Sequence, residues 1–282
     1  MSESPDIDPV CAFNLDGEGG AEAVSLDAVT PPGRSARAAP QASAPFDWIH
    51  LYRDDPRTRA FLEEESGLDP IVQDGLLAQD TRPRATVHGE GAVIILRGVN
   101  LHPGAEAEDM ISVRFWVEAG RVIGIWLRPL FAVADLMATI ERGGAPTSPG
   151  DLVARLALRL ADRMEPTLAK LHERVDTLED ALLDPEADPE RGELVDLRHE
   201  AIILRRFIGP QRDALTTLAV EDPAWLGERD RARVREAADR TMRILEELDS
   251  VRDQASVLHD QLMERRAAQM NRYTLLLSVV AA

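Results

Sequence analysis

The spacing of hydrophobic residues divides the chain into two parts. Up to about residue 145, short β-type runs alternate with loops and short helical stretches, whereas residues 150–282 have helical spacing almost throughout. In the first part we predict strands at residues 11–15, 46–51 and 92–96. Residues 111–117 and 121–127 form a predicted hairpin, because only three residues including Gly120 separate them. Helices are predicted at residues 57–65, 70–78 and 130–142.

The second part predicts two long helices that form an antiparallel hairpin. Asp151 is suited to cap the first helix, whose apolar residues recur every three or four positions up to Leu182. Pro166 lies inside this pattern and should kink or split the helix. After an acidic turn at residues 184–189, the return helix is expected to be interrupted at Gly209-Pro210.

A third long helix carries an uninterrupted heptad pattern. Its apolar stripe is formed by Val234, Ala237, Thr241, Ile244, Leu248, Val251, Ala255, Leu258 and Leu262. Such a repeat is typical of helices that pack on other helices. We therefore expect copies of the chain to self-associate through this stripe. From Tyr273 onward charge disappears and an apolar run begins. This run is expected to be the start of a membrane helix, the alternative being a helix end docked on its own domain.

These patterns give an α/β fold class with a defined order of parts. We expect a disordered tail at residues 1–9, an α/β domain with a mixed sheet at 10–145 and a helical hairpin at 151–220. A stalk helix at 228–270 and the truncated start of a first transmembrane helix at 271–282 follow. Residues 30–44 are rich in Pro, Ala, Ser and Gly, and we interpret them as a flexible insert.

Composition narrows the classes of function. The formal charge of −18 should repel nucleic acid and raise the local concentration of cations, although it is also compatible with solubility alone. Cys11 is the single cysteine, which excludes an internal disulfide and a Cys-rich zinc knuckle. No nucleotide-binding loop or metalloprotease motif occurs, and Ser148 lacks convincing His and Asp partners. The sequence therefore predicts a protein that is not an enzyme and has no organic cofactor.

Several short strings, in order, carry a resemblance to a known family. They include residues 16–20 (DGEGG), 48–51 (WIHL), 81–84 (TRPR), 89–91 (GEG), 96–97 (LR), 171–174 (LHER), 178–180 (LED), 182–184 (LLD), 204–207 (LRRF) and 210–213 (PQRD). Together with the order of the elements, these strings resemble the ZntB branch of the CorA metal-transporter superfamily. The triplet Gly98-Val99-Asn100 is similar to the family's pore signature, but it lies at the end of a predicted strand and is not interpreted as the pore.

The resemblance implies both a function and an assembly. Zinc would be the transported ion, with magnesium or another divalent cation as the alternative, in a homopentamer formed through the stalk helices. The full-length protein would lie in the bacterial inner membrane, with this chain as its cytoplasmic funnel, collecting or sensing the cation. Two alternatives stay open: a soluble coiled-coil scaffold or adaptor with an α/β sensor head, and a magnesium transporter of the same superfamily.

Zinc prefers His, Cys and carboxylate ligands, which directs attention to the six histidines. His172 and Asp176 lie one helical turn apart, and His172 falls within one of the resemblance strings. His259 and Asp260 lie beside the heptad stripe, where an assembly would repeat them around an axis. These four residues are the candidate metal ligands; the alternative is that they are ordinary surface residues. An acidic run, of Asp176, Glu179, Asp180, Asp184, Glu186, Asp188 and Glu190, suggests a second site for hard cations between subunits.

Overall fold

The computed structural model describes residues 11–26, 44–79, 81–184, 187 and 190–281. Its first part is built on a seven-stranded sheet with the order β2-β1-β3-β7-β6-β5-β4. The strands are β1 (Cys11–Leu15), β2 (Ala21–Val24), β3 (Phe46–Tyr52), β4 (Arg84–His88), β5 (Gly91–Gly98), β6 (Ile111–Glu118) and β7 (Arg121–Trp126). The pair β3·β7 is parallel and the other pairs are antiparallel. The predicted mixed sheet is therefore confirmed.

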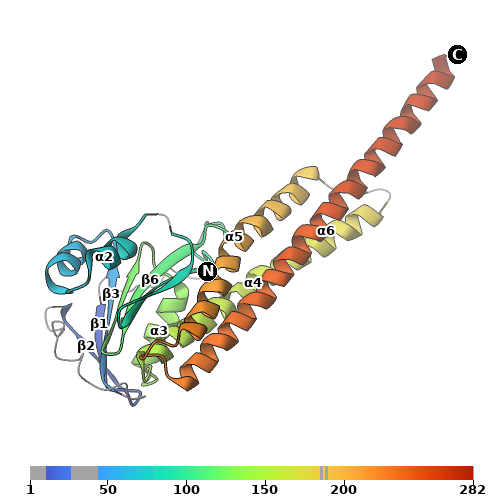
Figure 1. Cartoon of the computed structure of the whole chain (residues 1–282). Coiled ribbons are helices and arrows are strands. Elements are labelled where there is room, and N and C mark those ends of the chain that lie inside the picture. The colour runs from blue at the N-terminus through green and yellow to red at the C-terminus, as the bar shows by residue number, and fades with distance from the viewer. Residues whose placement is uncertain (1–10, 27–43, 80, 185–186, 188–189, 282) are drawn as a thin grey trace. The chain divides into compact units, whose positions relative to one another are not determined.

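Each face of the sheet has its own hydrophobic core, because alternate residues of a strand point to opposite faces. One core packs Ile49, Ile95 and their neighbours against a π-helical turn η2 (Phe61–Glu65) and α2 (Pro70–Leu77). The short helix α1 (Pro56–Ala60) leads directly into η2. The other core packs Trp48, Phe115 and their neighbours against α3 (Phe131–Glu141) and parts of the three long helices (Figure 1). Central strands buried on both faces explain the continuous apolar runs in the sequence.

The predicted strands and short helices are found close to their expected bounds. The hairpin of β6 and β7 is confirmed, with Glu118 paired to Arg121 across the turn. Two edge strands were not predicted: β2, and β4, which has mostly exposed side chains and so no apolar alternation to detect. The triplet Gly98-Val99-Asn100 ends β5 inside the folded sheet domain, as expected. The predicted tail at residues 1–9 and most of the flexible insert lie outside the described residues.

Three long helices follow the sheet: α4 (Pro149–Leu183), α5 (Arg191–Glu221) and α6 (Glu228–Ala281). α4 is not split at Pro166, and the predicted interruption of α5 at Gly209-Pro210 is wrong. A proline removes one backbone hydrogen bond, and packing on either side can outweigh that loss. In α5, the flanking Ile208, Leu215 and Leu218 are all buried.

Contacts divide the chain into two compact units whose borders fall within the long helices. The first consists of Met1–Met164 and Phe207–Arg243, and the second of Glu165–Arg206 and Ile244–Ala282. In the second unit, a bond from Arg174 to Glu200 joins α4 to α5, and one of 2.6 Å from Arg205 to Asp249 joins α5 to α6. This unit is therefore a bundle of three helical segments. The domain borders expected from the sequence stay a prediction.

The heptad stripe of α6 does not face outward. Every one of its nine residues is at most 6 % exposed within the single chain. The stripe packs against the chain's own helices, whose apolar faces also carry buried residues such as Leu171 on α4 and Leu197 on α5. The prediction that this stripe joins separate copies is wrong, because an intramolecular partner with the same periodicity already covers it.

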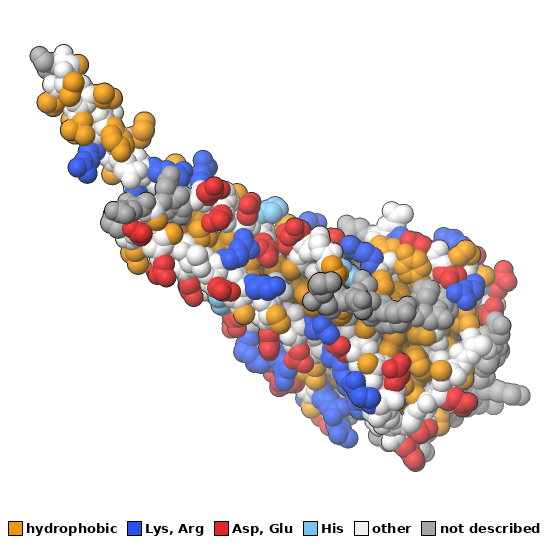
Figure 2. Space-filling model, turned by 180° about the vertical axis from the view of Figure 1, so that it is seen from behind, with side chains coloured by type: hydrophobic (Ala, Val, Ile, Leu, Met, Phe, Trp, Pro, Cys, Tyr) orange, Lys and Arg blue, Asp and Glu red, His pale blue; other side chains and the backbone are white. Residues whose placement is uncertain are grey.

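The last turns of α6 are apolar and exposed. Leu277 is 70 % exposed and Val280 is 85 % exposed, and hydrophobic side chains gather at this end of the helix (Figure 2). The alternative that this segment docks on its own domain is therefore not found. Among the described residues, none of the helices has an apolar stretch of the length and purity required to cross a bilayer.

Candidate functional site

The first pair of predicted metal ligands lies on the part of α4 that belongs to the bundle. His172 is half-buried and Asp176 is exposed, one turn further along the helix. Their spacing places both side chains on one side of α4, next to the buried Leu171 and Val175. Two ligands at this spacing can contact one ion, but a stable zinc site needs at least one more.

The second pair lies on α6. His259 Nδ1 is 3.5 Å from Asp260 Oδ1, with side chains 27 % and 84 % exposed. Within the described residues, no group of three or more His, Cys, Asp or Glu side chains converges in a way that could hold a metal ion. Any further ligand for either pair would therefore have to come from water, from a second copy or from residues outside that part.

The acidic run also lies on the surface. Asp176, Glu179, Asp180, Asp184 and Glu190 are all exposed, whereas Glu186 and Asp188 lie outside the described residues. The five described carboxylates form an exposed acidic surface, and the described part of the chain does not bring them together as a cation site.

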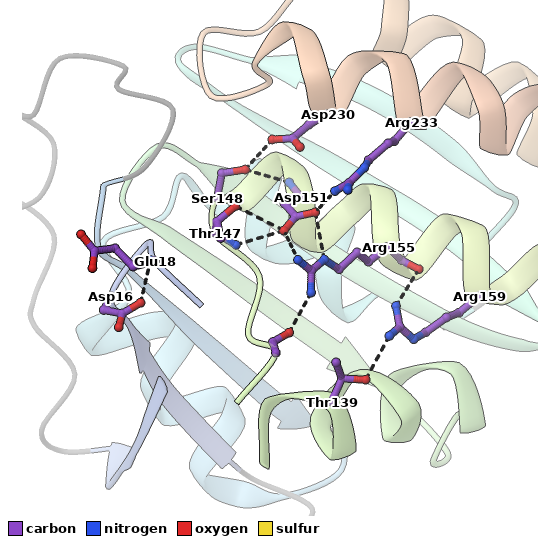
Figure 3. Close-up of polar contacts among 11 residues, drawn as sticks. Asp16, Glu18, Thr139, Thr147, Ser148, Asp151, Arg155, Arg159, Asp230 and Arg233 are labelled. Carbon is purple, nitrogen blue, oxygen red and sulfur yellow. Dashed lines mark hydrogen bonds and ion pairs between the residues drawn. The ribbon is translucent and has the colours of Figure 1, made fainter. Parts of the chain in front are cut away.

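A buried polar cluster at the start of α4 was not predicted from the sequence. We call it the helix-root cluster, and it consists of Thr147, Ser148, Asp151, Arg155, Asp230 and Arg233 (Figure 3). Asp151 is 1 % exposed and accepts hydrogen bonds from Thr147 N at 3.0 Å and from Arg155 Nε at 2.9 Å. Arg233 on α6 also donates to this carboxylate. The guanidinium groups of Arg155 and Arg233 thus compensate the negative charge of Asp151. A buried carboxylate needs such partners because it has lost its contact with water.

Ser148 connects the backbone of Asp151 to a second acidic residue, Asp230. Its hydroxyl donates to Asp230 Oδ2 at 2.5 Å and accepts from the backbone N–H of Asp151 at 2.8 Å. Burial, with a further contribution from Asp151, raises the pKa of Asp230 above its ordinary value. The cluster therefore joins the first turn of α6 to the first turn of α4 through the linker. Ser148 does have one carboxylate partner, Asp230, contrary to the expectation from sequence. Among the described residues its hydroxyl bonds Asp230 and the Asp151 backbone, and not a histidine.

The DGEGG loop lies near this cluster and has a structural role. Asp16 Oδ1 accepts the backbone N–H groups of Glu18 at 2.7 Å and Gly20 at 2.9 Å, and these bonds lower the pKa of Asp16. Gly19 O accepts from Ala145 N at 2.9 Å, so the loop is bound to the linker before α4. This string of the resemblance therefore shapes a turn.

Other resemblance residues meet in space although they are far apart in sequence. The backbone N–H of Arg97 on β5 donates to Gln211 Oε1 on α5 at 2.7 Å. The Arg97 guanidinium lies 4.1 Å from the centre of the Phe207 ring, a cation–π contact. These residues fix α5 to the sheet within the first unit. Three residues of the resemblance strings, Arg97, Phe207 and Gln211, therefore attach α5 to β5.

The first unit is therefore an α/β domain in which buried polar contacts attach parts of three long helices to each other and to a mixed sheet, and the second unit is a helical bundle. The family model described as "CorA-like Mg2+ transporter protein" matches residues 43–282. This chain therefore belongs to the CorA-like family of metal-ion transporter proteins.

Individual relatives agree with this assignment. The zinc transport protein ZntB of Yersinia enterocolitica is 32 % identical over 274 residues, covering 97 % of this chain and 80 % of that protein. The divalent cation transporter CmaX of Pseudomonas aeruginosa is 39 % identical over 235 residues, covering 83 % of this chain and 71 % of that protein.

Solved structures show the same relationship. The structure of full-length CmaX superposes with a TM-score of 0.87 at 34 % identity, over 98 % of this chain and 84 % of that one. The ZntB cytoplasmic domain from Vibrio parahaemolyticus, at 21 % identity, has a TM-score of 0.77 over 92 % of this chain, which shows the shared fold.

Proposed function

We propose that this chain is the cytoplasmic part of a divalent-cation transporter of the bacterial inner membrane, with zinc as the transported ion. The observation that carries the proposal is similarity to ZntB and CmaX over most of the chain, at 32 % and 39 % identity. The names of both relatives describe transport of zinc or of divalent cations. This argues against the scaffold alternative. The magnesium alternative differs only in the ion.

Two physical features support the proposal. The formal charge of −18 gives the chain a field that concentrates cations near its surface. The exposed apolar end of α6, from Tyr273 to Val280, would lose its contact with water by entering a bilayer. In this proposal residues 271–282 begin a membrane helix, and the sheet domain and bundle lie on the cytoplasmic side of it.

The proposed assembly is a homopentamer in which α6 contacts its copies through its outer side. The buried heptad stripe is already used within the chain. On the opposite side of α6, the apolar side chains of Met242, Val257 and Met263 are 36 %, 55 % and 42 % exposed. These residues recur within a broad arc of the helix, which is the pattern expected of a second packing face.

His172 with Asp176 and His259 with Asp260 are the proposed zinc-handling residues. Each pair supplies two ligands of the types zinc prefers. Repetition of a pair in an assembly around an axis would bring further copies of the same ligands within reach of one ion. One chain then need not supply a complete set of zinc ligands. This agrees with the finding that each pair supplies only two.

The transport proposal is tested in cells that express the full-length gene product. Zinc accumulation should rise above that of cells carrying an empty vector, and magnesium accumulation in parallel tests the alternative ion. If neither ion accumulates differently while the protein is present in the membrane fraction, the proposal is wrong.

The ligand assignment is tested by isothermal titration of the purified chain with zinc and magnesium, with mass determined by light scattering. Saturable zinc binding should be weakened by His172→Ala or His259→Ala, in a species close to five chains. His199→Ala removes an exposed histidine of α5 and is the matched control. Equal zinc binding by all variants would reject the ligand assignment, and a monomeric mass would reject assembly by this chain alone.

A further inference from the structure

Two guanidinium groups converge on one hydroxyl at the end of α3. Arg159 on α4 donates from Nη2 to Thr139 Oγ1 at 3.0 Å, as Figure 3 shows. Arg142, the residue that ends α3, approaches the same oxygen with Nη2 at 3.5 Å. The Thr139 hydroxyl donates its own proton to Asp135 O at 2.7 Å. Its oxygen therefore receives two cationic donors while carrying no charge itself.

The carboxylates around these two arginines are already engaged. Arg163 holds Asp135 with two bonds of 2.6 and 2.7 Å, and Arg240 holds Asp162 at 2.6 Å. Asp151 is bonded to Arg155 and Arg233 in the helix-root cluster. Among the described residues, neither Arg142 nor Arg159 forms an ion pair with a carboxylate.

Glu141 is the nearest acidic residue in sequence to Arg142, but its position on α3 does not suit it as a partner. Thr139 and Arg142 are three residues apart and share a side of α3, whereas Glu141 is two residues from Thr139 and points elsewhere. Burial, followed by the neighbouring Arg155 charge, lowers the pKa of Arg159 despite the opposing carboxylates. The surroundings of this guanidinium therefore do not fully compensate its charge.

Arg159 also donates from Nη1 to the backbone carbonyl of Arg155 at 3.3 Å, a neutral acceptor that does not compensate its charge. A positive charge near a helix C-terminus interacts favourably with the last carbonyl groups. In α3 those carbonyls are already bonded, since Gly143 N donates to Ile140 O at 2.8 Å and Gly144 N donates to Thr139 O at 2.9 Å. Placing two guanidinium groups on one neutral oxygen has an electrostatic cost that a bound anion would remove.

We propose that Thr139, Arg142 and Arg159 form a binding site for a phosphate group. Guanidinium forks donate parallel N–H groups that suit the oxygens of phosphate, and charge-assisted bonds of this kind are strong. The ligand is either free inorganic phosphate or a phosphate monoester, which share this group. On a chain of net charge −18, weak non-specific binding of anions is suppressed, so binding would report this local site.

The test is isothermal titration of the chain with inorganic phosphate and, in parallel, with phenyl phosphate, at constant low ionic strength. Arg159→Gln and Arg142→Gln should each weaken binding by about tenfold or more, the loss expected for one charge-assisted bond. Arg128→Gln, which changes the same charge in an exposed pair with Asp109, is the control and should bind within about twofold of wild type. If inorganic phosphate binds with this dependence on the two arginines, the site is supported and the ligand is free phosphate. If only phenyl phosphate binds with the same dependence, the site is supported and the ligand is a phosphate monoester.

Three outcomes would overturn the proposal. The first is that neither ligand binds the wild-type chain saturably. The second is that the Arg128→Gln control loses as much affinity as the site variants. The third is that Arg142→Gln binds like wild type. Arg159 also links α4 to α3, so Arg159→Gln is checked for folding by circular dichroism. Arg142 is exposed and its replacement should leave the fold intact, which keeps the test decisive.

Discussion

Gly124 on β7 lies directly opposite His50 on β3 in the parallel register of these strands. A Cβ atom added at Gly124 would lie 2.3 Å from His50 Nδ1 and 2.6 Å from Phe115 Cε1. The imidazole is fully buried, with its ring centre 4.5 Å from that of Trp126. The missing side chain at position 124 is what makes room for His50 in the core.

Gly124→Ala should therefore destabilise the sheet domain. The added methyl group would force His50 and Phe115 to move in a packed core, which costs about 1–3 kcal/mol. Urea unfolding followed by circular dichroism measures this change. Gly192→Ala is the matched control, because no atom lies within 4 Å of its added Cβ and alanine favours the helix. Equal stability of both variants would contradict the packing described for Gly124.

His50 should make stability depend on pH in the acidic range. Burial lowers the pKa of His50 from 6.5 to about 3. Below pH 6.5 the unfolded chain binds a proton that the folded chain does not, so the free energy of unfolding falls as the pH falls. From pH 7 to pH 5 this group should remove about 2 kcal/mol. His50→Leu should lose that part of the pH dependence, and an unchanged slope in this variant would show that His50 is not the group responsible.

Ser148→Ala should weaken the helix-root cluster. The substitution removes the bond to Asp230 Oδ2 and leaves both that carboxylate and the Asp151 N–H without a partner. A loss of about 2 kcal/mol is expected for a buried bond to a charged group. Ser256→Ala is the control, since its hydroxyl bonds only the Arg252 carbonyl in the same helix, and it should change stability by less than about 0.5 kcal/mol. Thermal unfolding of the wild type, Ser148→Ala and Ser256→Ala measures both losses of stability. A similar loss in the two variants would contradict the role given to Ser148.

Leu248→Asp and Val257→Asp separate the two sides of α6. Leu248 is completely buried, so a charge there should cost about 3–5 kcal/mol of folding stability. Val257 is 55 % exposed, and Val257→Asp should change stability by less than about 0.5 kcal/mol while weakening self-association. Sedimentation and urea unfolding measure both effects. The reverse result, with Leu248→Asp folding normally but failing to associate, would restore the heptad stripe as the contact between copies.

The sequence predicted those elements whose apolar pattern is strong. The central strands and the β6–β7 hairpin were found because burial on both faces produces long apolar runs. The strand β4 was missed because its exposed side chains leave no such run. The effect of proline at position 210 was overestimated, because a local rule does not include the buried Ile208 and Leu215 that hold α5 on either side.

Contacts between residues far apart in the sequence could not be predicted from the hydrophobic pattern. The heptad stripe was correctly interpreted as a packing surface, but the pattern cannot distinguish a partner in the same chain from one in a copy. The bond between Ser148 and Asp230 joins residues 82 positions apart, and no spacing rule anticipates it. The metal-ligand residues stay a prediction, since each pair supplies only two ligands within one chain.

The central claim, transport of a divalent cation, is tested most directly with the full-length gene product reconstituted in lipid vesicles that contain a zinc-sensitive dye. We expect zinc added outside to enter these vesicles faster than protein-free vesicles, with magnesium measured in parallel using its own dye. If correctly folded protein in the membrane admits neither ion faster than lipid alone, the account of this chain as part of a cation transporter is contradicted.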